Sequence, residues 1–230
     1  MFNGKMKALT FSYDDGITTD GRLIDILNRY GMRGTFNLNS ATHVERGNPR
    51  MERIAKDGKT QVARYWRDEL ADVYKGHEIA VHALTHPDLT KLSEEECCHE
   101  ILADVENLTA YFGTKPVGMA YPYGTHNDAV VNVLRDCGIR YSRTTVSTRR
   151  FDIPCDLLRL PATCHHNDAA LMELAEQFVN AEPETPMLFY VWGHSYEFAD
   201  RDNWDVIERF CDYMAGRDDI FYGTNAEVLL

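Results

Sequence analysis

The strongest constraint on the fold is an alternation along the chain between short apolar runs and longer segments with helical spacing. Seven runs are typical of β-strands, at 7–13, 33–39, 77–83, 117–122, 139–144, 187–194 and 220–224. Helical periodicity marks segments between them, at 20–31, 64–76, 92–113, 127–138, 167–181 and 203–216. Such alternation predicts an α/β fold with a parallel sheet and helical crossovers, either closed into a barrel or left open. Segment 40–63 fits neither period and is expected to be a loop near the mouth of the fold.

Length and charge narrow the class of protein. A chain of 230 residues can form one large domain, and we expect residues 1–230 to be a single domain. The net charge of −12 argues against nucleic acid and anionic membranes as partners, because both require a basic face. No apolar stretch has the length of a membrane span, and residues 1–11 lack the apolar core of a secretory signal. We therefore expect a cytoplasmic protein, whose oligomeric state the sequence leaves open.

The six cysteines show no CxxC spacing and are expected to be reduced thiols, mostly buried. They are Cys97, Cys98, Cys137, Cys155, Cys164 and Cys211. The tripeptide at 164–166, Cys-His-His, could bind a metal in principle, but a lone tripeptide is a weak signal for such a site.

Polar residues gather at the ends of four predicted strands. Asp14 and Asp15 follow the first strand, His82 and His86 follow the third, and His194 ends the apolar run at 187–194. The segment 121–128, "YPYGTHND", follows the fourth strand. Because the carboxyl ends of parallel strands meet at one edge, where α/β folds build active sites, we expect these side chains to lie close together.

The spacing of His82 and His86 suggests a metal site. On a helical turn, two imidazoles four residues apart would project to one side, and with a carboxylate they would form a three-ligand set with one open position. One aspartate of the adjacent pair would bind the cation, and its neighbour would accept a proton from bound water, whose pKa a divalent cation lowers to about 7. The alternative is that His82 ends a strand, His86 begins a turn, and Asp-Asp-Gly is a solvated turn.

These residues resemble the motifs of the polysaccharide deacetylase family (NodB homology, carbohydrate esterase family 4). The family's first motif, Thr-Phe-Asp-Asp-Gly, is similar to "FSYDDG", and its second, His-Ser/Thr-x-x-His, to "HALTH". The third, Arg-x-Pro-Tyr, is similar to "AYPYG", and the fifth, Leu-x-His, to "VWGH". The resemblance extends from residue 8 to about residue 195.

The resemblance implies a fold, a metal site and roles for single residues. The fold would be a distorted (β/α)7 barrel of the TIM-barrel-like type. Asp14 would be the general base and His194 the general acid, and the backbone N–H of Tyr123 would help to hold the oxyanion. A divalent metal ion would be bound, with zinc as the first choice and cobalt, manganese or nickel as alternatives. Its ligands would be Asp15, His82 and His86.

The implied reaction is metal-dependent hydrolysis of a non-peptide amide bond, with N-deacetylation of an N-acetylated sugar or glycan as the leading hypothesis. Tyr121, Tyr123 and Trp192 are candidates for an apolar platform that binds the sugar or the acetyl methyl, although aromatic residues in such strands are commonly core residues. Two alternatives stay open. One is a cyclic amidase of the allantoinase type or another small-molecule amide hydrolase on the same scaffold. The other is a catalytically silent carbohydrate-binding protein.

Two departures from the family pattern concern the electrostatics of the site. The arginine of the third motif is Ala120 here, so the charge beside the base has to come from elsewhere, with Arg143 and Arg159 as candidates. The aspartate of the fourth motif has no clear counterpart, and Asp152 or Asp156 could substitute for it.

Three further polar residues stay open between a functional and a structural role. Glu197, three residues after His194, could supply a carboxylate to that histidine or lie in a surface turn. His165 and His166 could reach the mouth of the fold or serve as hydrogen-bonded structural histidines.

Overall fold

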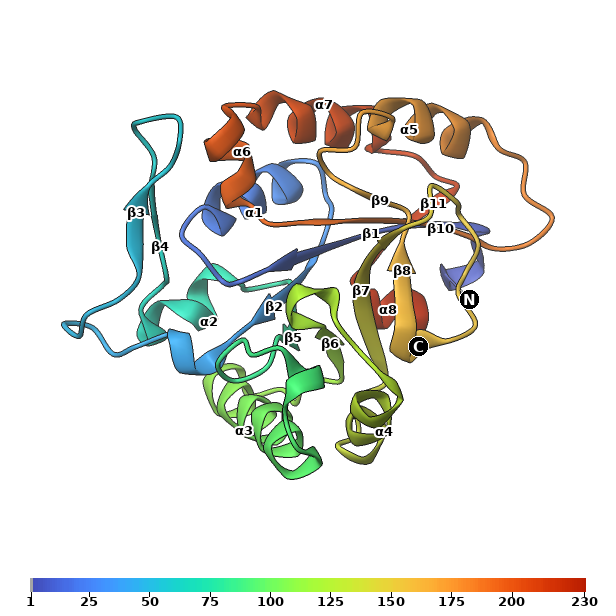
Figure 1. Ribbon diagram of the computed structural model, residues 1–230. Coiled ribbons are helices and arrows are strands. Elements are labelled where there is room, and N and C mark those ends of the chain that lie inside the picture. Colours follow the sequence, from blue (N-terminus) through green and yellow to red (C-terminus); the bar gives the residue numbers. More distant parts are fainter. Residues whose placement is uncertain (1) are drawn as a thin grey trace.

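A curled, mainly parallel sheet forms the centre of the protein, as seen in a computed structural model that describes residues 2–230 (Figure 1). Each strand contacts the next in the order β8-β7-β6-β5-β2-β1-β10-β9. In that order the strands span Leu160–Ala162, Tyr141–Ser147, Gly118–Ala120, Glu78–Val81, Thr35–Leu38, Lys7–Asp14, Met187–Gly193 and Cys164–His165.

The two ends of the sheet meet in one segment, 160–165. Its first half, β8, pairs with β7, and its second half, β9, pairs with β10. Between them, the N–H of Thr163 donates to the carbonyl of Tyr190 at 2.9 Å. The sheet therefore curls round onto itself without a regular closing ladder, which is the distorted (β/α)7 barrel that the motifs implied. Its seven positions are segment 160–165, β7, β6, β5, β2, β1 and β10.

One member of this ring differs from the prediction. The run 220–224 does form a strand, β11 (Ile220–Tyr222), but it pairs only with β1 and lies off the path of the ring. Segment 160–165 takes the seventh position, although the sequence did not identify it as a strand. Pro161 lacks a backbone N–H and interrupts the apolar run, so this segment has the pattern of a loop.

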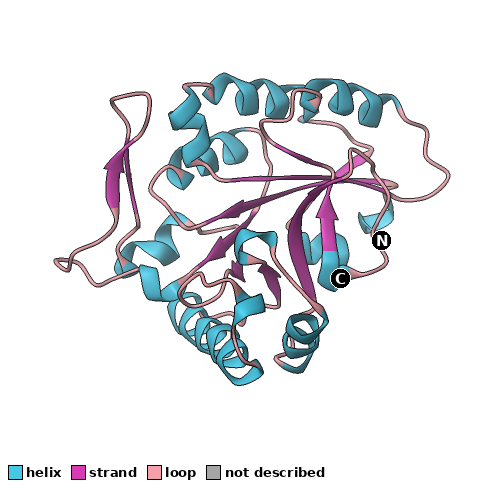
Figure 2. Ribbon diagram, viewed as in Figure 1, coloured by secondary structure: helices cyan, strands magenta, loops and turns pink. Residues whose placement is uncertain are grey.

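Helices cover the sheet from two sides (Figures 1 and 2). On one side lie α1 (Asp20–Arg29), α5 (Leu171–Asn180), α6 (Tyr196–Arg201) and α7 (Trp204–Met214). On the other lie α2 (Leu70–Val73), α3 (Glu94–Phe112) and α4 (Asp128–Asp136). The longest, α3, begins with a capping box formed by Ser93 and Glu96 and ends at Gly113 in the left-handed conformation. α2 is shorter than the helix predicted at 64–76, and α6 and α8 (Asn225–Leu229) were not predicted.

Short 3₁₀ helices complete the described elements. They span Phe2–Gly4, Ser40–Thr42, Arg67–Glu69, Leu89–Lys91, Pro122–Gly124 and Leu157–Arg159.

The inside of the barrel is partly polar, and β1 explains how this arises. All eight residues of β1 are buried, and successive side chains point to opposite faces. Leu9, Phe11 and Tyr13 pack in the main core among the outer helices. The alternate residue Thr10 donates its hydroxyl to Asn225 of α8, at 2.8 Å, inside the barrel. The same alternation turns Asp14, the last residue of β1, toward the barrel interior.

Segment 40–63 contains regular structure that its sequence did not predict. β3 (Glu52–Ile54) and β4 (Gln61–Ala63) form an antiparallel hairpin, which projects beside the barrel in Figure 1. Arg53 of β3 makes a bidentate contact with Asp200 of α6, at 2.8 and 2.9 Å. The hairpin is therefore fastened to the helix that follows His194.

No helix in the described part of the chain combines the length and apolarity that a membrane crossing requires. In the same residues all six cysteines are free thiols, and four of them are buried, as the sequence predicted.

Candidate active site

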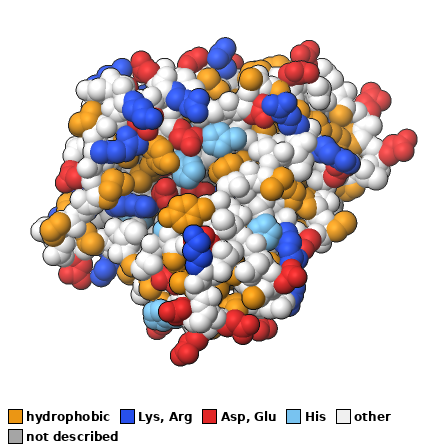
Figure 3. Space-filling view, viewed as in Figure 1, with side chains coloured by type: hydrophobic (Ala, Val, Ile, Leu, Met, Phe, Trp, Pro, Cys, Tyr) orange, Lys and Arg blue, Asp and Glu red, His pale blue; other side chains and the backbone are white. Residues whose placement is uncertain are grey.

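The predicted polar residues converge at the carboxyl ends of neighbouring strands. Asp14 is the last residue of β1, His82 directly follows β5, and His194 directly follows β10. β5, β2, β1 and β10 are consecutive in the sheet. Figure 3 shows the corresponding face, where acidic and histidine side chains meet in a hollow bordered by hydrophobic and basic side chains.

Asp15, His82 and His86 form a set of side chains that can hold a metal ion. One ligand atom from each lies within 4.8 Å of the others. The Nδ1–H of His82 donates a hydrogen bond to the carbonyl oxygen of Ala120 at 2.7 Å, which leaves Nε2 free to bind a cation. Burial lowers the pKa of His82 to about 4, so its imidazole is neutral, as a ligand must be. One carboxylate and two imidazoles suit zinc and similar divalent ions and leave coordination positions open. The residues present therefore fit such an ion.

The two histidines do not lie on a helical turn, which corrects the expectation drawn from their spacing. Ala83 and His86 both have left-handed backbone conformations, with φ of 61° and 64°. The resulting loop brings the two rings to 4.7 Å between centroids. Asn39 donates to the carbonyl of Ala83 at 2.8 Å, and Asp104 accepts from the N–H of His82 at 3.1 Å. Buried polar contacts, rather than helical geometry, therefore hold the loop.

The adjacent aspartates point to different places because the chain turns sharply between them. Asp15 and Gly16 have φ of 83° and 63°, in the left-handed region that favours glycine. A Cβ atom on Gly16 would lie 2.6 Å from Nε2 of His43, so no side chain fits there. This turn directs Asp15 toward His86, with 3.9 Å between Oδ1 and Nε2, while Asp14 stays inside the barrel.

Asp14 is buried and ionised. Its carboxylate forms an ion pair with Arg143, and Asn37 donates to its Oδ1 at 2.8 Å. Burial raises the pKa of Asp14, but the charge and hydrogen bond of Arg143, together with the nearby His194, outweigh burial and lower the pKa below its ordinary value. A buried carboxylate that is ionised and oriented in this way can accept a proton.

Arg143 supplies the charge that the third motif lacks. It lies on β7 directly opposite Ala120 on β6, the two being Cα partners in the strand register. The guanidinium therefore reaches Asp14 from the neighbouring strand. The other candidate, Arg159, is wrong, because it lies at the surface and pairs with Asp156 at 2.7 Å and Asp128 at 2.6 Å.

His194 faces the aspartates with one nitrogen and a carboxylate with the other. Its Nε2 lies 3.9 Å from Oδ2 of Asp14 and 4.0 Å from Oδ2 of Asp15. Its Nδ1 lies 3.2 Å from Oε1 of Glu197. Burial disfavours the imidazolium, but the hydrogen bond to Glu197 and the charges of the aspartates raise the pKa of His194 above its ordinary value. A histidine in this environment is suited to donate a proton.

The carboxylate that contacts His194 is Glu197 and neither of the candidates Asp152 and Asp156, which both pair elsewhere. Asp152 pairs with Arg150 at 2.6 Å and Asp156 pairs with Arg159, all at the surface. Glu197 is the second residue of α6, one turn beyond His194, and its N–H donates to the carbonyl of His194 at 3.1 Å.

The three aromatic candidates have different environments. Tyr121 is buried and donates its hydroxyl to the carbonyl of Leu158 at 2.7 Å, so its predicted contact with substrate is wrong. Trp192 is 8% exposed and packs under the guanidinium of Arg143, with 4.5 Å from Cζ to the ring centroid. Tyr123 is 66% exposed, and its ring centroid lies 4.6 Å from that of His86. Its backbone is left-handed, with φ of 59°. Tyr123 is thus the candidate most open to a ligand.

Two residues at the site were not identified from the sequence. Arg64, directly after β4, lies 3.5 Å from Oδ1 of Asp15, and Asn37 orients Asp14 from β2. The position of segment 40–63 at the mouth was a signal for Arg64, and a polar residue inside the apolar run 33–39 was a signal for Asn37.

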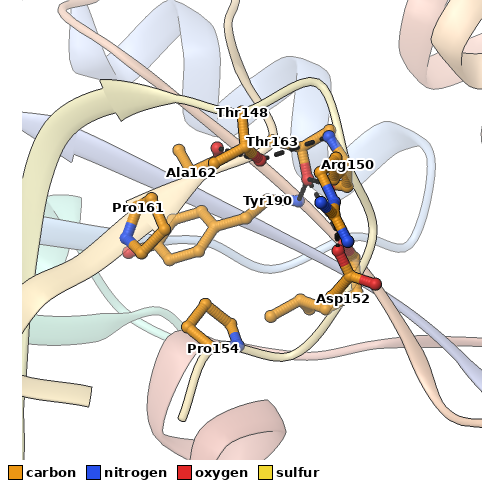
Figure 4. A pocket seen from close by; sticks show the side chains of 9 residues that line it. Thr148, Arg150, Asp152, Pro154, Pro161, Ala162, Thr163 and Tyr190 are labelled. Carbon is orange, nitrogen blue, oxygen red and sulfur yellow. Dashed lines mark hydrogen bonds and ion pairs between the residues drawn. The ribbon is translucent and has the colours of Figure 1, made fainter. Parts of the chain in front are cut away.

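A separate cavity of about 230 Å³ lies between the loop after β7 and strands β8 and β10 (Figure 4). Its polar groups are already paired: Arg150 with Asp152, and the hydroxyl of Thr163 with the carbonyl of Arg150 at 3.0 Å. We assign no reaction to this cavity.

Comparison with protein families gives a match to the polysaccharide deacetylase model over residues 2–142. Among curated proteins, the peptidoglycan-N-acetylglucosamine deacetylase PgdA of Listeria monocytogenes serotype 1/2a (strain 10403S) is 26% identical over 127 residues. The match covers 54% of this chain but only 23% of PgdA, so the chain spans about a quarter of that relative's length.

Solved structures share the fold over nearly the whole chain. A putative polysaccharide deacetylase from Mycobacterium smegmatis has a TM-score of 0.67 at 17% identity, with 98% of this chain and 90% of that chain covered. A family 4 carbohydrate esterase from Streptomyces lividans, in complex with acetate, has a TM-score of 0.60 at 16% identity, covering 96% and 93%. BA3943 from Bacillus anthracis, a family 4 pseudoenzyme, has a TM-score of 0.56 at 16% identity, covering 97% and 66%.

Proposed function

The chain belongs to the polysaccharide deacetylase family, and we propose that it is a metal-dependent N-deacetylase that removes acetate from an N-acetylated sugar or oligosaccharide. One observation carries the proposal: three side chains that can hold a cation, a buried carboxylate and a histidine suited to donate a proton lie together at the carboxyl ends of neighbouring strands. The set is Asp15, His82 and His86, and the other two residues are Asp14 and His194.

The metal site would supply one part of the chemistry. A divalent ion held by Asp15, His82 and His86 would provide a Lewis acid beside the amide. The exposed Tyr123 ring, next to His86, would bind the sugar face or the acetyl group, and the backbone N–H of Tyr123 would donate to the developing oxyanion.

Asp14 would be the general base. Asn37 and Arg143 orient its carboxylate and keep it ionised, so it can remove a proton from the attacking water. As the water oxygen bonds to the amide carbon, a tetrahedral oxyanion forms. These contacts exist before substrate binds, so little reorganisation is needed during the reaction.

His194 would be the general acid. Because the carboxylate of Glu197 accepts from Nδ1, the Nε2 of His194 faces the hollow and can protonate the leaving nitrogen. The carbon–nitrogen bond then breaks, which yields acetate and a free amine. An amine is a poor leaving group unless it is protonated, so this step requires the acid.

Two alternatives predict different products. A cyclic amidase would open a ureide ring, and a silent binding protein would bind glycan without turnover, as the existence of a family pseudoenzyme allows. The presence of ligands, base and acid together favours an active enzyme.

The single catalytic domain over residues 1–230 and the cytoplasmic location remain predictions.

The test is acetate release from a substrate panel. Protein loaded in turn with zinc, cobalt, manganese or nickel is incubated with N-acetylhexosamines, chitooligosaccharides, peptidoglycan fragments and ureides. We expect acetate from at least one N-acetylated sugar. Asp14→Asn should retain the metal and lose about 10²- to 10⁴-fold in rate. Ureide turnover without acetate, or glycan binding without any turnover, would overturn the proposal.

A further inference from the structure

A second group of side chains with metal-binding chemistry lies directly behind His194. It consists of His165, His166 and Glu197, whose potential ligand atoms lie within 4.8 Å of one another. His165 is the last residue of β9, the strand that pairs with β10, and His166 follows it; Glu197 lies on α6. Such a group could hold a second cation, or it could fix the carboxylate that contacts His194. The hydrogen bonds distinguish these two uses.

The protonation state of His165 argues against a second cation. The backbone N–H of Asn167 donates to Nδ1 of His165 at 3.1 Å, so the proton of a neutral ring lies on Nε2. That Nε2–H donates a hydrogen bond to Oε2 of Glu197 at 2.9 Å. To bind a metal through Nε2, His165 would need its proton on Nδ1. That proton would then point at the N–H of Asn167, so two donors would face each other. Both ring nitrogens of His165 therefore have partners without an ion.

Glu197 is held from several directions, which leaves one oxygen aimed at the active site. Its Oε2 accepts from His165 and from the side-chain amide of Asn167, the latter at 3.2 Å. Asn203 in turn donates to Oδ1 of Asn167 at 2.9 Å, which fixes the orientation of that amide. Oε1 of Glu197 is left to accept from Nδ1 of His194. Nδ1 of His194 must therefore carry a proton, and Nε2 faces Asp14 and Asp15.

His166 supports this group mainly by packing. Its ring is completely buried and stacks on Phe198, with 4.0 Å between centroids. Its Nε2 lies 3.1 Å from Oε2 of Glu197, and burial lowers the pKa of His166 to about 4, so the ring is neutral. A Cβ atom on Gly193 would lie only 2.2 Å from Nδ1 of His166. The strand therefore admits the ring only because residue 193 is glycine.

We propose that His165 is a positioning residue for the deacetylation step: it fixes Glu197, which in turn holds the tautomer and ring orientation of His194. This inference rests on the proposed function only where it assigns an effect on turnover. The fixing of His194 itself is a property of the protein that can be measured without substrate.

The kinetic test compares two substitutions of His165. His165→Leu removes the donor to Glu197, and His165→Gln keeps an N–H near the original position. On the best N-acetylated substrate, His165→Leu should lower kcat about 10- to 100-fold and leave KM unchanged, and His165→Gln should restore most of the rate. An activated ester, whose leaving group needs no proton, should be affected less than the amide by His165→Leu. His99→Leu, on the exposed face of α3, is the matched control and should behave as the unmodified protein.

Metal analysis separates positioning from coordination. The unmodified protein and both His165 variants should each bind one equivalent of zinc. Their melting temperatures should also be similar. Loss of a second equivalent in His165→Leu, with retention in His99→Leu, would establish a second cation and overturn the proposal. So would equal losses on amide and ester, or a His165→Gln variant as impaired as His165→Leu.

Nitrogen-15 NMR of the His194 ring in zinc-treated protein gives the readout that does not depend on activity. The unmodified protein and His165→Gln should carry the His194 proton on Nδ1, and His165→Leu should show a mixture of states. A proton on Nε2 alone in the unmodified protein would overturn the positioning role. If the NMR spectra show the expected pattern but no N-acetylated sugar releases acetate, the proposed function is refuted and the positioning role is still supported.

Discussion

Replacing Arg143 by methionine tests the buried ion pair that orients the general base. The side chains of Arg143 and Asp14 are only 1% and 4% exposed, so Arg143→Met would leave a buried carboxylate without its countercharge. Breaking a buried pair in this way costs about 3–5 kcal/mol. A chain of 230 residues has an unfolding entropy of about 0.5 kcal/mol/K at the midpoint, at roughly 2.1 cal/mol/K per residue. The melting temperature should therefore fall by about 6–10 °C.

The measurement is thermal unfolding by circular dichroism after removal of metal with a chelator, so that cation binding does not contribute. Arg159→Met is the control, because Arg159 pairs with carboxylates at the surface, and it should cost no more than about 1 kcal/mol. In the Asp14→Asn background, the cost of Arg143→Met should fall by at least about 1.5 kcal/mol, because the uncompensated charge is gone. Equal costs in both backgrounds, or equal costs for the two arginines, would refute the reasoning.

Three further predictions concern the ligands, the acid and a buried carboxyl group. His82→Ala and His86→Ala should each lose the bound cation in mass-spectrometric metal analysis, and stoichiometric retention in both would exclude the ligand assignment. His194→Ala should slow amide hydrolysis about 10²- to 10⁴-fold and activated esters much less, and equal losses would argue against its role as acid. Burial raises the pKa of Asp20 to about 7, despite hydrogen bonds from Ser195 and Tyr74. The folded protein then keeps a proton that the unfolded chain releases near pH 4, so the contribution of Asp20 to stability should fall by up to about 1.4 kcal/mol per pH unit from about pH 4 to 7. In urea titrations across that range, the difference in unfolding free energy between the unmodified protein and Asp20→Asn should shift in favour of Asp20→Asn as the pH rises, and a constant difference would contradict the assignment.

The sequence identified the class of fold because alternating periods of two and 3.6 residues are local properties. It misplaced one ring position, because segment 160–165 is short and carries Pro161, whereas 220–224 has a more regular apolar pattern. The curl of the sheet, which makes 160–165 contact both β7 and β10, is a long-range property that no local pattern contains. The hairpin of 52–63 escaped prediction because each strand has only three residues.

The candidate site divides in the same way. Asp14, Asp15 and His82 follow apolar strands directly, so their meeting at one edge could be inferred from the alternation. Arg143 and Glu197 were among the sequence candidates for the partners that set their electrostatics, but the sequence could not separate them from Arg159, Asp152 and Asp156, because contact with Asp14 or His194 depends on positions in space. The left-handed loop that joins His82 to His86 was also hidden, since the spacing alone equally suits a helical turn.

The placement of Arg143 opposite Ala120 bears on how relatives of this chain can be recognised. A sequence alignment compares residues position by position. At the first position of the third motif this chain has Ala120, where the family motif described above has arginine. In this chain the cation beside Asp14 is Arg143, which lies on the neighbouring strand opposite Ala120, so the charge is present in space although the motif lacks it. Related chains with alanine at the position of Ala120 and arginine at the position of Arg143 should be grouped together. A search that requires arginine in the third motif would miss such chains.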